Sequence, residues 1–478
     1  MSIKTNFLYS CILAVSTYVF PLLVYPYVSR TLGLTNIGIV NFVDNLINYF
    51  VLVSMMGIST VGVREIAASK NDIHKVSNAF VSLFSLTIVT TFISIIGLLI
   101  AMYTIQNLFP YRDLLYVGMI KLFFNMFLVE WLFKGLEDFK YITNRSLFVK
   151  CLYIALIFLF VKSPSDYKLY FTFSVSMVAV NALINFFYCR NIVRISFADI
   201  SIKPYLPPFL LMGIYFLFTN IYTSFNAVWL GLATNTDEVG YFTTATKLHV
   251  IIMSILASFT SVLFPRVSCL LSEGNKKEYW QKISMSLDAI FLFSFPIVVL
   301  LLVAGPDILH IIVGDGFEGA YTPLRLISPL VLVIGIEQIL VIQILLAMHS
   351  DRIVLIGSII GALVSAILNI LFVNSMGAIG SSLAWLGAEC SILLMSLFYC
   401  NKYYDYKFPY LKLLVYIICY GVICFVLYLL YTNLACHVIV KIAITTLAMA
   451  VCVFVSEVYI TKNPVALLCL SKRLNSKH

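Results

Sequence analysis

Four polar side chains lie in the middle of a stretch that is otherwise apolar enough for a lipid bilayer. Asn41, Asn45 and Asn48 share one face of a helix, and Asp44 stands beside that face. A charged side chain at the centre of a membrane helix costs roughly 2.5–3.5 kcal/mol on insertion scales. A buried carboxylate must therefore be protonated, paired or hydrated. The pattern favours the wall of a polar cavity, and hydrogen bonding between helices is the alternative.

Further cations and amides lie inside or at the ends of other apolar stretches. We expect these side chains and those of the first group to line a cationic, polar cavity: Arg30, Asn41, Asp44, Asn48, Lys121, Lys247, Arg325 and Gln338. For Arg30, Lys121 and Arg325, extension of the long side chain to the lipid headgroups is the alternative.

Three carboxylates are candidates for coupling to a proton or a sodium ion. They are Asp44, Glu130 near the end of the fourth predicted span, and Glu337 deep in the tenth. Intramembrane carboxylates commonly mark ion pathways and proton relays, because they face protein or water rather than lipid.

The composition indicates a membrane protein. Hydrophobic residues make up 61% of the 478 residues and charged residues only 11%, against about 25% charged in soluble domains. The mean hydropathy is +0.99. A net charge of +9 does not indicate a nucleic-acid partner here, because basic residues gather on the cytoplasmic side of membrane proteins.

The apolar stretches predict an all-α integral membrane protein with about fourteen transmembrane helices. The predicted spans are 7–29, 37–62, 78–104, 112–133, 146–161, 167–190, 208–232, 239–264, 284–309, 323–348, 353–374, 378–400, 411–431 and 437–461. Most of the 31 Lys and Arg residues fall in loops on one side, so the positive-inside rule predicts that both termini are cytoplasmic. The first apolar run is expected to be a retained span and not a cleaved signal peptide.

Two sets of residues recur at one spacing. Gly38 and Gly240 are 202 residues apart, and so are Arg64 and Arg266. Six predicted spans separate the copies, which predicts a parallel repeat. We therefore expect two six-helix lobes around a central cavity, residues 1–206 and 207–402, followed by a helix pair and a cytoplasmic tail in 403–478.

Neither a metal site nor a catalytic centre is indicated. The chain has no CxxC, HxxH or HExxH spacing. No predicted loop reaches 20 residues, so no soluble domain is expected that could house a catalytic centre. We expect a protein that is not an enzyme and needs no cofactor.

Four segments resemble one family of transporters. They are RTLGLTNIGIVNF (30–42), GISTVGVREIA (57–67), EWLFKGLEDFKYITNR (130–145) and FNAVWLGLATNTDEVGYFTTATKL (225–248). The chain is similar in these segments, and in its predicted spans, to the Wzx-type O-antigen or capsule repeat-unit flippases of the multidrug/oligosaccharidyl-lipid/polysaccharide exporter superfamily. The matching positions are Gly33, Gly38, Arg64, Glu65, Trp131, Gly135 and Gly240.

The resemblance implies a substrate, a location and partners. The substrate is an undecaprenyl-diphosphate-linked oligosaccharide, moved from the inner to the outer leaflet of the bacterial cytoplasmic (inner) membrane by alternating access. The product serves lipopolysaccharide O-antigen or capsule assembly. The implied partners are membrane lipids, a polysaccharide polymerase and a chain-length regulator. In relatives, the last two spans border a groove for the lipid tail.

Three other functions are alternatives. A drug or cation antiporter of the same superfamily usually has twelve spans and a carboxylate-rich cavity. A peptidoglycan lipid-precursor flippase has denser arginines in its first two spans, where this chain has only Arg30 before Arg64. An O-antigen polymerase needs catalytic residues on a large outer loop, and no such loop is predicted.

Overall fold

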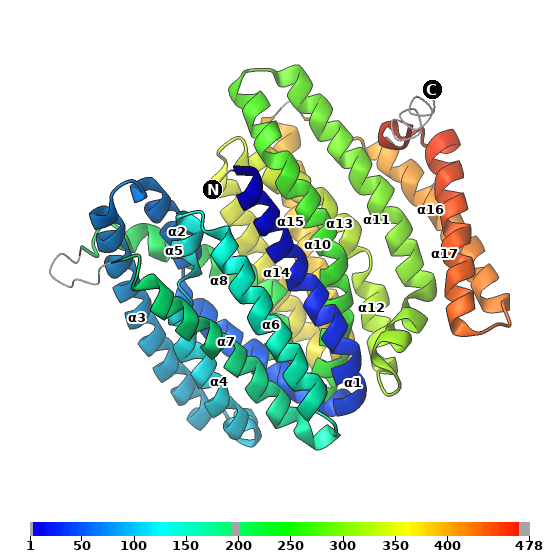
Figure 1. The fold of residues 1–478 in the computed structure, drawn as a ribbon. Coiled ribbons are helices and arrows are strands. Elements are labelled where there is room, and N and C mark those ends of the chain that lie inside the picture. The colour runs from blue at the N-terminus through cyan, green and yellow to red at the C-terminus, as the bar shows by residue number, and fades with distance from the viewer. Residues whose placement is uncertain (1–2, 194–200, 405, 468–478) are drawn as a thin grey trace. The chain divides into compact units, whose positions relative to one another are not determined.

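The chain folds entirely into helices where its structure is described. The structure is a computed structural model, and it describes residues 3–193, 201–404 and 406–467; no strand occurs in these ranges (Figure 1). Twelve helices are long and apolar enough to cross a membrane, or thirteen when a bent pair, Leu206–Tyr222 and Phe225–Ala233, forms one span. The prediction of an all-α integral membrane protein is confirmed.

The predicted number of fourteen spans is approximate, because the first two predicted spans form one helical segment. α1 runs over Ile3–Met55 without a loop, and only Gly33 inside it has non-helical dihedral angles, φ 76° and ψ 172°. A straight helix of 53 residues would be about 80 Å long, far more than the ~30 Å hydrocarbon core. Gly33 allows this break because glycine adopts positive φ without steric cost. Figure 1 shows the dark blue first half of α1 running down from the N-terminus before the chain changes direction.

The residues form two compact units, Met1–Gly240 and Tyr241–His478. The first unit holds α1, α2 (Ile58–Ser69), α3 (Ile73–Thr104), α4 (Arg112–Asn125), α5 (Glu130–Gly135), α6 (Phe139–Phe160), α7 (Tyr167–Cys189), α8 (Leu206–Thr223), α9 (Phe225–Ala233) and the start of α10 (Thr236–Ser272). α8 and α9 pack against α1 and α2 in this unit. The predicted lobes, which rest on the internal repeat and divide at residue 206, stay a prediction.

The predicted fifth span begins too late. α6 starts at Phe139, after the Asp138 side chain caps it by accepting a hydrogen bond from the Tyr141 backbone amide. The prediction started this span at residue 146, because the charged residues before it indicate a loop. Arg145 and Lys150 therefore lie within the helix.

α1 and α6 run in the same direction in a fixed register. Among the hydrogen bonds that join them are those from Thr143 Oγ1 to the Tyr9 carbonyl (3.0 Å), from Lys150 Nζ to Ser16 Oγ (2.9 Å) and from Tyr27 OH to the Val161 carbonyl (2.6 Å). Each pair is 134 residues apart in sequence. The constant separation shows that the two helices do not slip relative to each other over this length.

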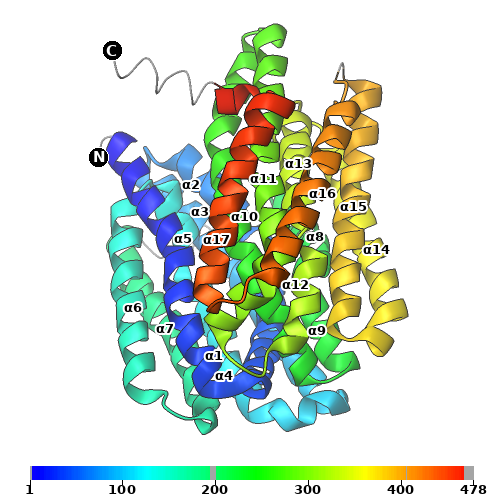
Figure 2. The ribbon, with the colours of Figure 1, turned by 90° about the vertical axis from the view of Figure 1, so that its right-hand side faces the viewer.

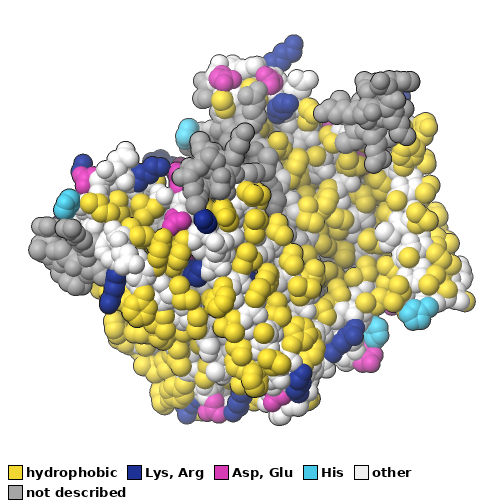
Figure 3. Space-filling view, viewed as in Figure 1, with side chains coloured by type: hydrophobic (Ala, Val, Ile, Leu, Met, Phe, Trp, Pro, Cys, Tyr) yellow, Lys and Arg dark blue, Asp and Glu magenta, His cyan; other side chains and the backbone are white. Residues whose placement is uncertain are grey.

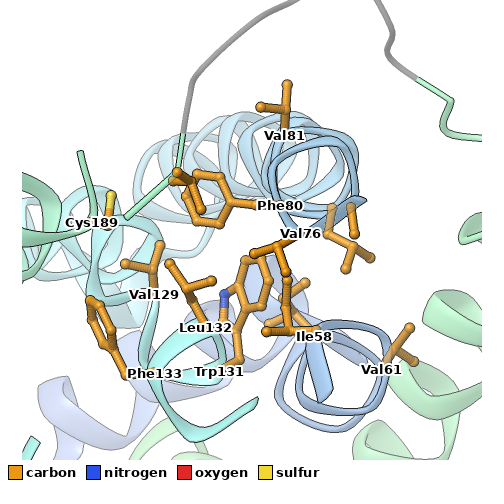
Figure 4. Close-up of a cluster of buried hydrophobic side chains, with 14 of the residues drawn as sticks. Ile58, Val61, Val76, Phe80, Val81, Val129, Trp131, Leu132, Phe133 and Cys189 are labelled. Carbon is orange, nitrogen blue, oxygen red and sulfur yellow. The ribbon is translucent and has the colours of Figure 1, made fainter. Parts of the chain in front are cut away.

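A buried cluster joins α2, α3 and α5 near one end of the first unit (Figure 4). The rings of Trp131 and Phe80 stack with centroids 5.4 Å apart. The Trp131 indole also covers Gly62, where a Cβ would lie 2.6 Å from the ring. Trp131 is one of the positions on which the resemblance to the flippases rests. Its ring leaves no space for a side chain at position 62.

The second unit holds the rest of α10 and the helices that follow it. These are α11 (Lys276–Val313), α12 (Tyr321–Ile327), α13 (Leu330–Gln338), α14 (Asp351–Met376), α15 (Ala378–Tyr403), α16 (Tyr410–Asn433) and α17 (Val438–Val455), with π-helical segments at Ile339–Leu346 and Ser456–Ile460. α14 and α15 lie side by side (Figure 2). A Cβ at Gly357 of α14 would lie 2.4 Å from the Met395 side chain of α15, so this glycine permits close packing.

Polar contacts hold α16 against α11. Lys412 of α16 pairs with Asp288 of α11, and Tyr431 donates a hydrogen bond to Asp307. Both pairs are 124 residues apart, so α16 runs parallel to α11. A groove of about 520 Å³, lined mostly by apolar side chains, lies between these two helices.

Side chains sort by type along the face of the first unit that Figure 3 shows. Hydrophobic side chains form a broad band there, and most Lys, Arg, Asp and Glu side chains gather at its margins. This distribution is typical of a membrane-spanning protein.

The repeated glycines contact each other. A Cβ at Gly38 would lie 1.9 Å from the Thr236 carbonyl oxygen and 3.3 Å from the Gly240 nitrogen. The second half of α1 and the start of α10 therefore meet backbone to backbone.

We predict that Gly38→Ala destabilises the protein by about 1–3 kcal/mol, because the added methyl group would overlap a backbone carbonyl and not a flexible side chain. The measurement is the melting temperature of the purified protein in detergent. Gly421→Ala on α16 is the matched control, since no atom lies within 4 Å of its Cβ position. Equal melting temperatures for the two variants would contradict the predicted close contact.

Candidate functional site

Asp44 is neutralised by an ion pair. Its Oδ1 lies 2.6 Å from Nζ of Lys121 on α4, and its Oδ2 accepts a hydrogen bond of 3.0 Å from Asn48 Nδ2. The side chains are 32% (Asp44) and 13% (Lys121) exposed. The structure therefore brings together three of the predicted cavity residues.

The close approach of α1 and α4 makes this pair possible. A Cβ at Gly118 of α4 would lie 2.5 Å from the Ile47 side chain of α1. Gly118 is three residues before Lys121, and Ile47 is three residues after Asp44, so the contact lies about one helical turn from the pair. A larger residue at position 118 would move the ammonium away from the carboxylate.

Two tyrosines from other helices complete this group. Tyr153 of α6 and Tyr170 of α7 lie beside each other, and both lie near Asp44. We call Asp44, Asn48, Lys121, Tyr153 and Tyr170 the Asp44 cluster. It offers ammonium, amide and hydroxyl donors together with carboxylate and amide acceptors, which are the groups that bind sugars and phosphates in proteins.

The other two asparagines of the opening pattern differ from Asn48. The Asn45 amide donates to the Asn41 carbonyl oxygen of its own helix, at 2.8 Å. This bond lies within α1 and joins no second helix, so the cavity wall and hydrogen bonding between helices both stay predictions for these two residues.

Glu130 is also paired, and by a residue that was expected in a loop. Arg145 Nη2 of α6 lies 2.6 Å from Glu130 Oε1, and Lys134 Nζ lies 3.5 Å from Oε2. Because the fifth span was predicted to start at residue 146, Arg145 was not recognised as part of a membrane-spanning helix.

In the second unit, Glu337 lies beside a second carboxyl group. Glu337 of α13 and Glu389 of α15 are within hydrogen-bonding range of each other. Trp385 Nε1 donates to Glu389 Oε1 at 2.9 Å, and the His249 ring packs edge-on against Trp385 at 5.1 Å. A proton shared by the two carboxyl groups, or a cation held by both, would relieve the repulsion between them.

The sequence did not single out Glu389, Trp385 or His249. The available signal was a carboxylate in the middle of the predicted span 378–400. Among the described residues, Glu337 Oε2 and both ring nitrogens of His249 are buried without a hydrogen-bond partner. These atoms and the carboxyl pair are the chemical basis for holding a proton or cation.

The remaining predicted residues have different surroundings. Gln338 Oε1 accepts a hydrogen bond of 3.0 Å from Thr260 Oγ1 on α10. Lys247 on α10 is half-buried, and Arg30 on α1 and Arg325 on α12 are exposed. A place in a cavity wall and extension of the side chain to the lipid headgroups both fit these positions, so the roles of the three cations stay predictions.

One group of side chains lies close enough for a metal ion in the described part of the chain. His310, Asp315 and Glu318 bring one ligand atom each within 4.8 Å of the others, and both carboxylates are exposed. Exposed acidic groups commonly approach one another without a metal, so we assign no metal to them.

Comparisons with known proteins agree with the geometry. The profile of the family described as "Polysaccharide biosynthesis protein" matches residues 3–271. A relative from Escherichia coli (strain K12), named "Putative O-antigen transporter", is 25% identical over 401 residues, which is 83% of this chain and 96% of the relative. A protein of the same name from Shigella dysenteriae is 26% identical over 404 residues, 82% of this chain and 99% of the relative.

Solved structures show the same fold. "Lipid II flippase MurJ, inward closed conformation" superposes with a TM-score of 0.75 at 16% identity, over 95% of this chain and 98% of that chain. An inward-facing multidrug resistance MATE family transporter of the MOP superfamily gives a TM-score of 0.59 at 14% identity, over 80% of this chain and 97% of that chain. At these identities the likeness shows the fold alone.

We predict energetic coupling between Asp44 and Lys121. Asp44→Asn and Lys121→Met should each destabilise the protein, because each single change leaves an unpaired polar or charged group. The double variant should be destabilised by less than the sum of the two single effects. A double-mutant cycle on thermal or denaturant unfolding should give a coupling of about 1 kcal/mol or more.

The control cycle uses Asp113→Asn and Lys168→Met, an ion pair whose side chains are 77% and 54% exposed. We expect no measurable coupling there, since solvent screens exposed pairs. Additive effects at Asp44 and Lys121 would rule out the intramembrane ion pair.

Proposed function

Because this chain belongs to the polysaccharide biosynthesis protein family, we propose that it is a flippase for undecaprenyl-diphosphate-linked oligosaccharide repeat units. It moves them from the inner to the outer leaflet of the bacterial cytoplasmic membrane for O-antigen or capsule assembly, with both of its own termini in the cytoplasm. The observation that carries the proposal is the similarity to curated O-antigen transporters along 83% of the chain.

The buried polar groups suit the chemistry of such a substrate. A diphosphate is a dianion that arginine binds in a bidentate manner and lysine binds as a point charge. A sugar chain needs amides, hydroxyls and aromatic faces, which the Asp44 cluster and the 29 tyrosines supply. The polyprenyl tail is as apolar as lipid and needs no polar surroundings. The protein thus replaces water around the polar head while the tail stays in the bilayer.

In this proposal, alternating access carries the head across. Arg30, Lys247 and Arg325 supply positive charge along its path, and Asn41, Asn48, Lys121 and Gln338 contact its sugars and phosphates. The antiporter and peptidoglycan-precursor alternatives are supported by fold likeness alone. The polymerase and the chain-length regulator are proposed partners that act on the product.

Coupling to a proton or sodium ion belongs to the same proposal. Of the three candidate carboxylates, Asp44 and Glu130 already have cationic partners. Glu337 lies beside Glu389, a neighbour of like charge. In the described part of the chain no lysine or arginine forms an ion pair with Glu337 or Glu389, so a cation can bind there without displacing one, and we assign the coupling to this pair.

The function is tested in a strain that lacks the chromosomal gene. We expect loss of surface polysaccharide and accumulation of lipid-linked repeat units on the cytoplasmic leaflet, both restored by the wild-type gene. Arg30→Ala, Lys247→Ala and Arg325→Ala should restore display to about a tenth or less at equal protein level, given that a charged hydrogen bond contributes roughly 1.5–3 kcal/mol.

Arg352→Ala is the control, since Arg352 is an exposed cation at the start of α14. Unchanged display in the deletion strain would refute the flippase assignment. Full display with all three cavity variants would remove only the cationic path.

We predict that Glu337→Gln and Glu389→Gln abolish the response of transport to an imposed proton or sodium gradient, because a neutral amide cannot exchange a cation. The measurement is uptake of a lipid-linked oligosaccharide analogue into proteoliposomes with and without each gradient. Glu318→Gln, on the exposed segment before α12, is the control. A normal gradient response in both pair variants would exclude the pair from coupling.

A further inference from the structure

Arg145 is a buried cation whose hydrogen bonds are incomplete. Its side chain is 4% exposed, and only Nη2 has a protein acceptor, Glu130. Nε and Nη1 are buried without a hydrogen-bond partner in the described part of the chain. A buried charged donor without an acceptor is strongly unfavourable, and a guanidinium presents its donors in a fork that matches two oxygens of a phosphate.

The surroundings of Arg145 carry excess positive charge. Lys134 shares Glu130 with it. Lys150 lies five residues further along the same helix, and its hydrogen bonds go to neutral hydroxyls, Ser16 at 2.9 Å and Thr17 at 3.4 Å. Arg145 and Lys134 thus share one carboxylate, and Lys150 has no carboxylate within 4.0 Å in the described part of the chain. An anion carrying two charges would neutralise the group.

The positions of the cations follow a path into the membrane. α6 begins at Phe139, so Arg145 lies about 9 Å and Lys150 about 16 Å along the helix axis from its start. The positive-inside rule predicts that this start is at the cytoplasmic surface. A lipid-borne anion entering from the cytoplasmic leaflet would meet Arg145 first and Lys150 deeper.

Neighbouring contacts hold the group in place. Lys150 lies between two of the hydrogen bonds that join α1 and α6, those of Thr143 and Tyr27. One turn before Arg145, the Tyr141 ring stacks on Tyr188 of α7 at 3.7 Å. The cations are therefore positioned before a ligand arrives, which lowers the entropic cost of binding.

We propose that Arg145 and Lys150 form a binding site for the phosphate head of a membrane lipid, with Lys134 as an outer cation. Resting on the proposed function, the first candidate is the diphosphate of the lipid-linked substrate before it enters the transport path. An anionic bilayer phospholipid carries the same chemistry. Arg145 donates from Nε or from Nη1 to a phosphate oxygen, and Lys150 neutralises the remaining charge.

The test measures lipid binding by the purified full-length protein, by native mass spectrometry and by thermal shift. The probes are undecaprenyl diphosphate, phosphatidylglycerol and neutral phosphatidylcholine. We expect wild type to bind undecaprenyl diphosphate at least tenfold more tightly than Lys150→Met does. Comparable binding of phosphatidylglycerol would assign the site to bilayer anions, and its absence would assign it to the substrate.

A second variant covers the case in which loss of Arg145 alone prevents folding. The double change Glu130→Gln with Arg145→Met removes both charges of the pair, leaves no unpaired carboxylate, and should also weaken binding at least tenfold. Lys168→Met, an exposed cation of the same unit, is the matched control and should bind as wild type does.

Wild-type affinity for undecaprenyl diphosphate and phosphatidylglycerol in both Lys150→Met and the double variant would overturn the site. This result is independent of the transport assays. Binding that depends on Arg145 and Lys150, combined with normal polysaccharide display in the deletion strain, would retain the site and reject the flippase function.

Discussion

The ion pair between Asp44 and Lys121 determines how the interior of the first unit is built. A carboxylate inside the membrane requires a fixed partner, and the partner comes from α4 only because Gly118 allows that helix to approach α1. Tyr153 of α6 and Tyr170 of α7 lie near this pair. A carboxylate whose burial alone would be unfavourable thus lies where four helices approach one another.

The same constraint organises the other buried charges. Asp288 and Lys412 join α11 to α16, and buried Glu457 near the end of α17 accepts hydrogen bonds from Tyr416 (2.7 Å) and Tyr420 (2.6 Å) of α16. These contacts are fully matched and position helices. Arg145 and the Glu337–Glu389 pair differ, since each retains buried polar atoms without protein partners. Arg145 and Glu337 therefore keep buried donor or acceptor atoms that a ligand could use.

Much of the architecture was predictable from the sequence, because a helix that crosses a lipid bilayer must be mostly apolar and about 20 residues long. Asp44 and Lys121 were both expected in the site, although their pairing depends on the packing of Gly118, which no local pattern reveals. Arg145 was missed because the charged residues around it indicate a loop, whereas the Asp138 cap starts α6 seven residues before it. Glu389 lies in a predicted span, but its importance comes from a neighbour 52 residues away in the chain.

The position of Gly33 has a consequence for how the first unit can change shape. The hydrogen bonds described between α1 and α6 attach to α1 residues before Gly33, whereas Asp44 lies after it. The first half of α1 and α6 therefore form one stiff pair, and rotation about the two backbone dihedral angles of a single residue is enough to reorient the half that carries the carboxylate. Motion of Asp44 relative to that pair needs no helix to unwind.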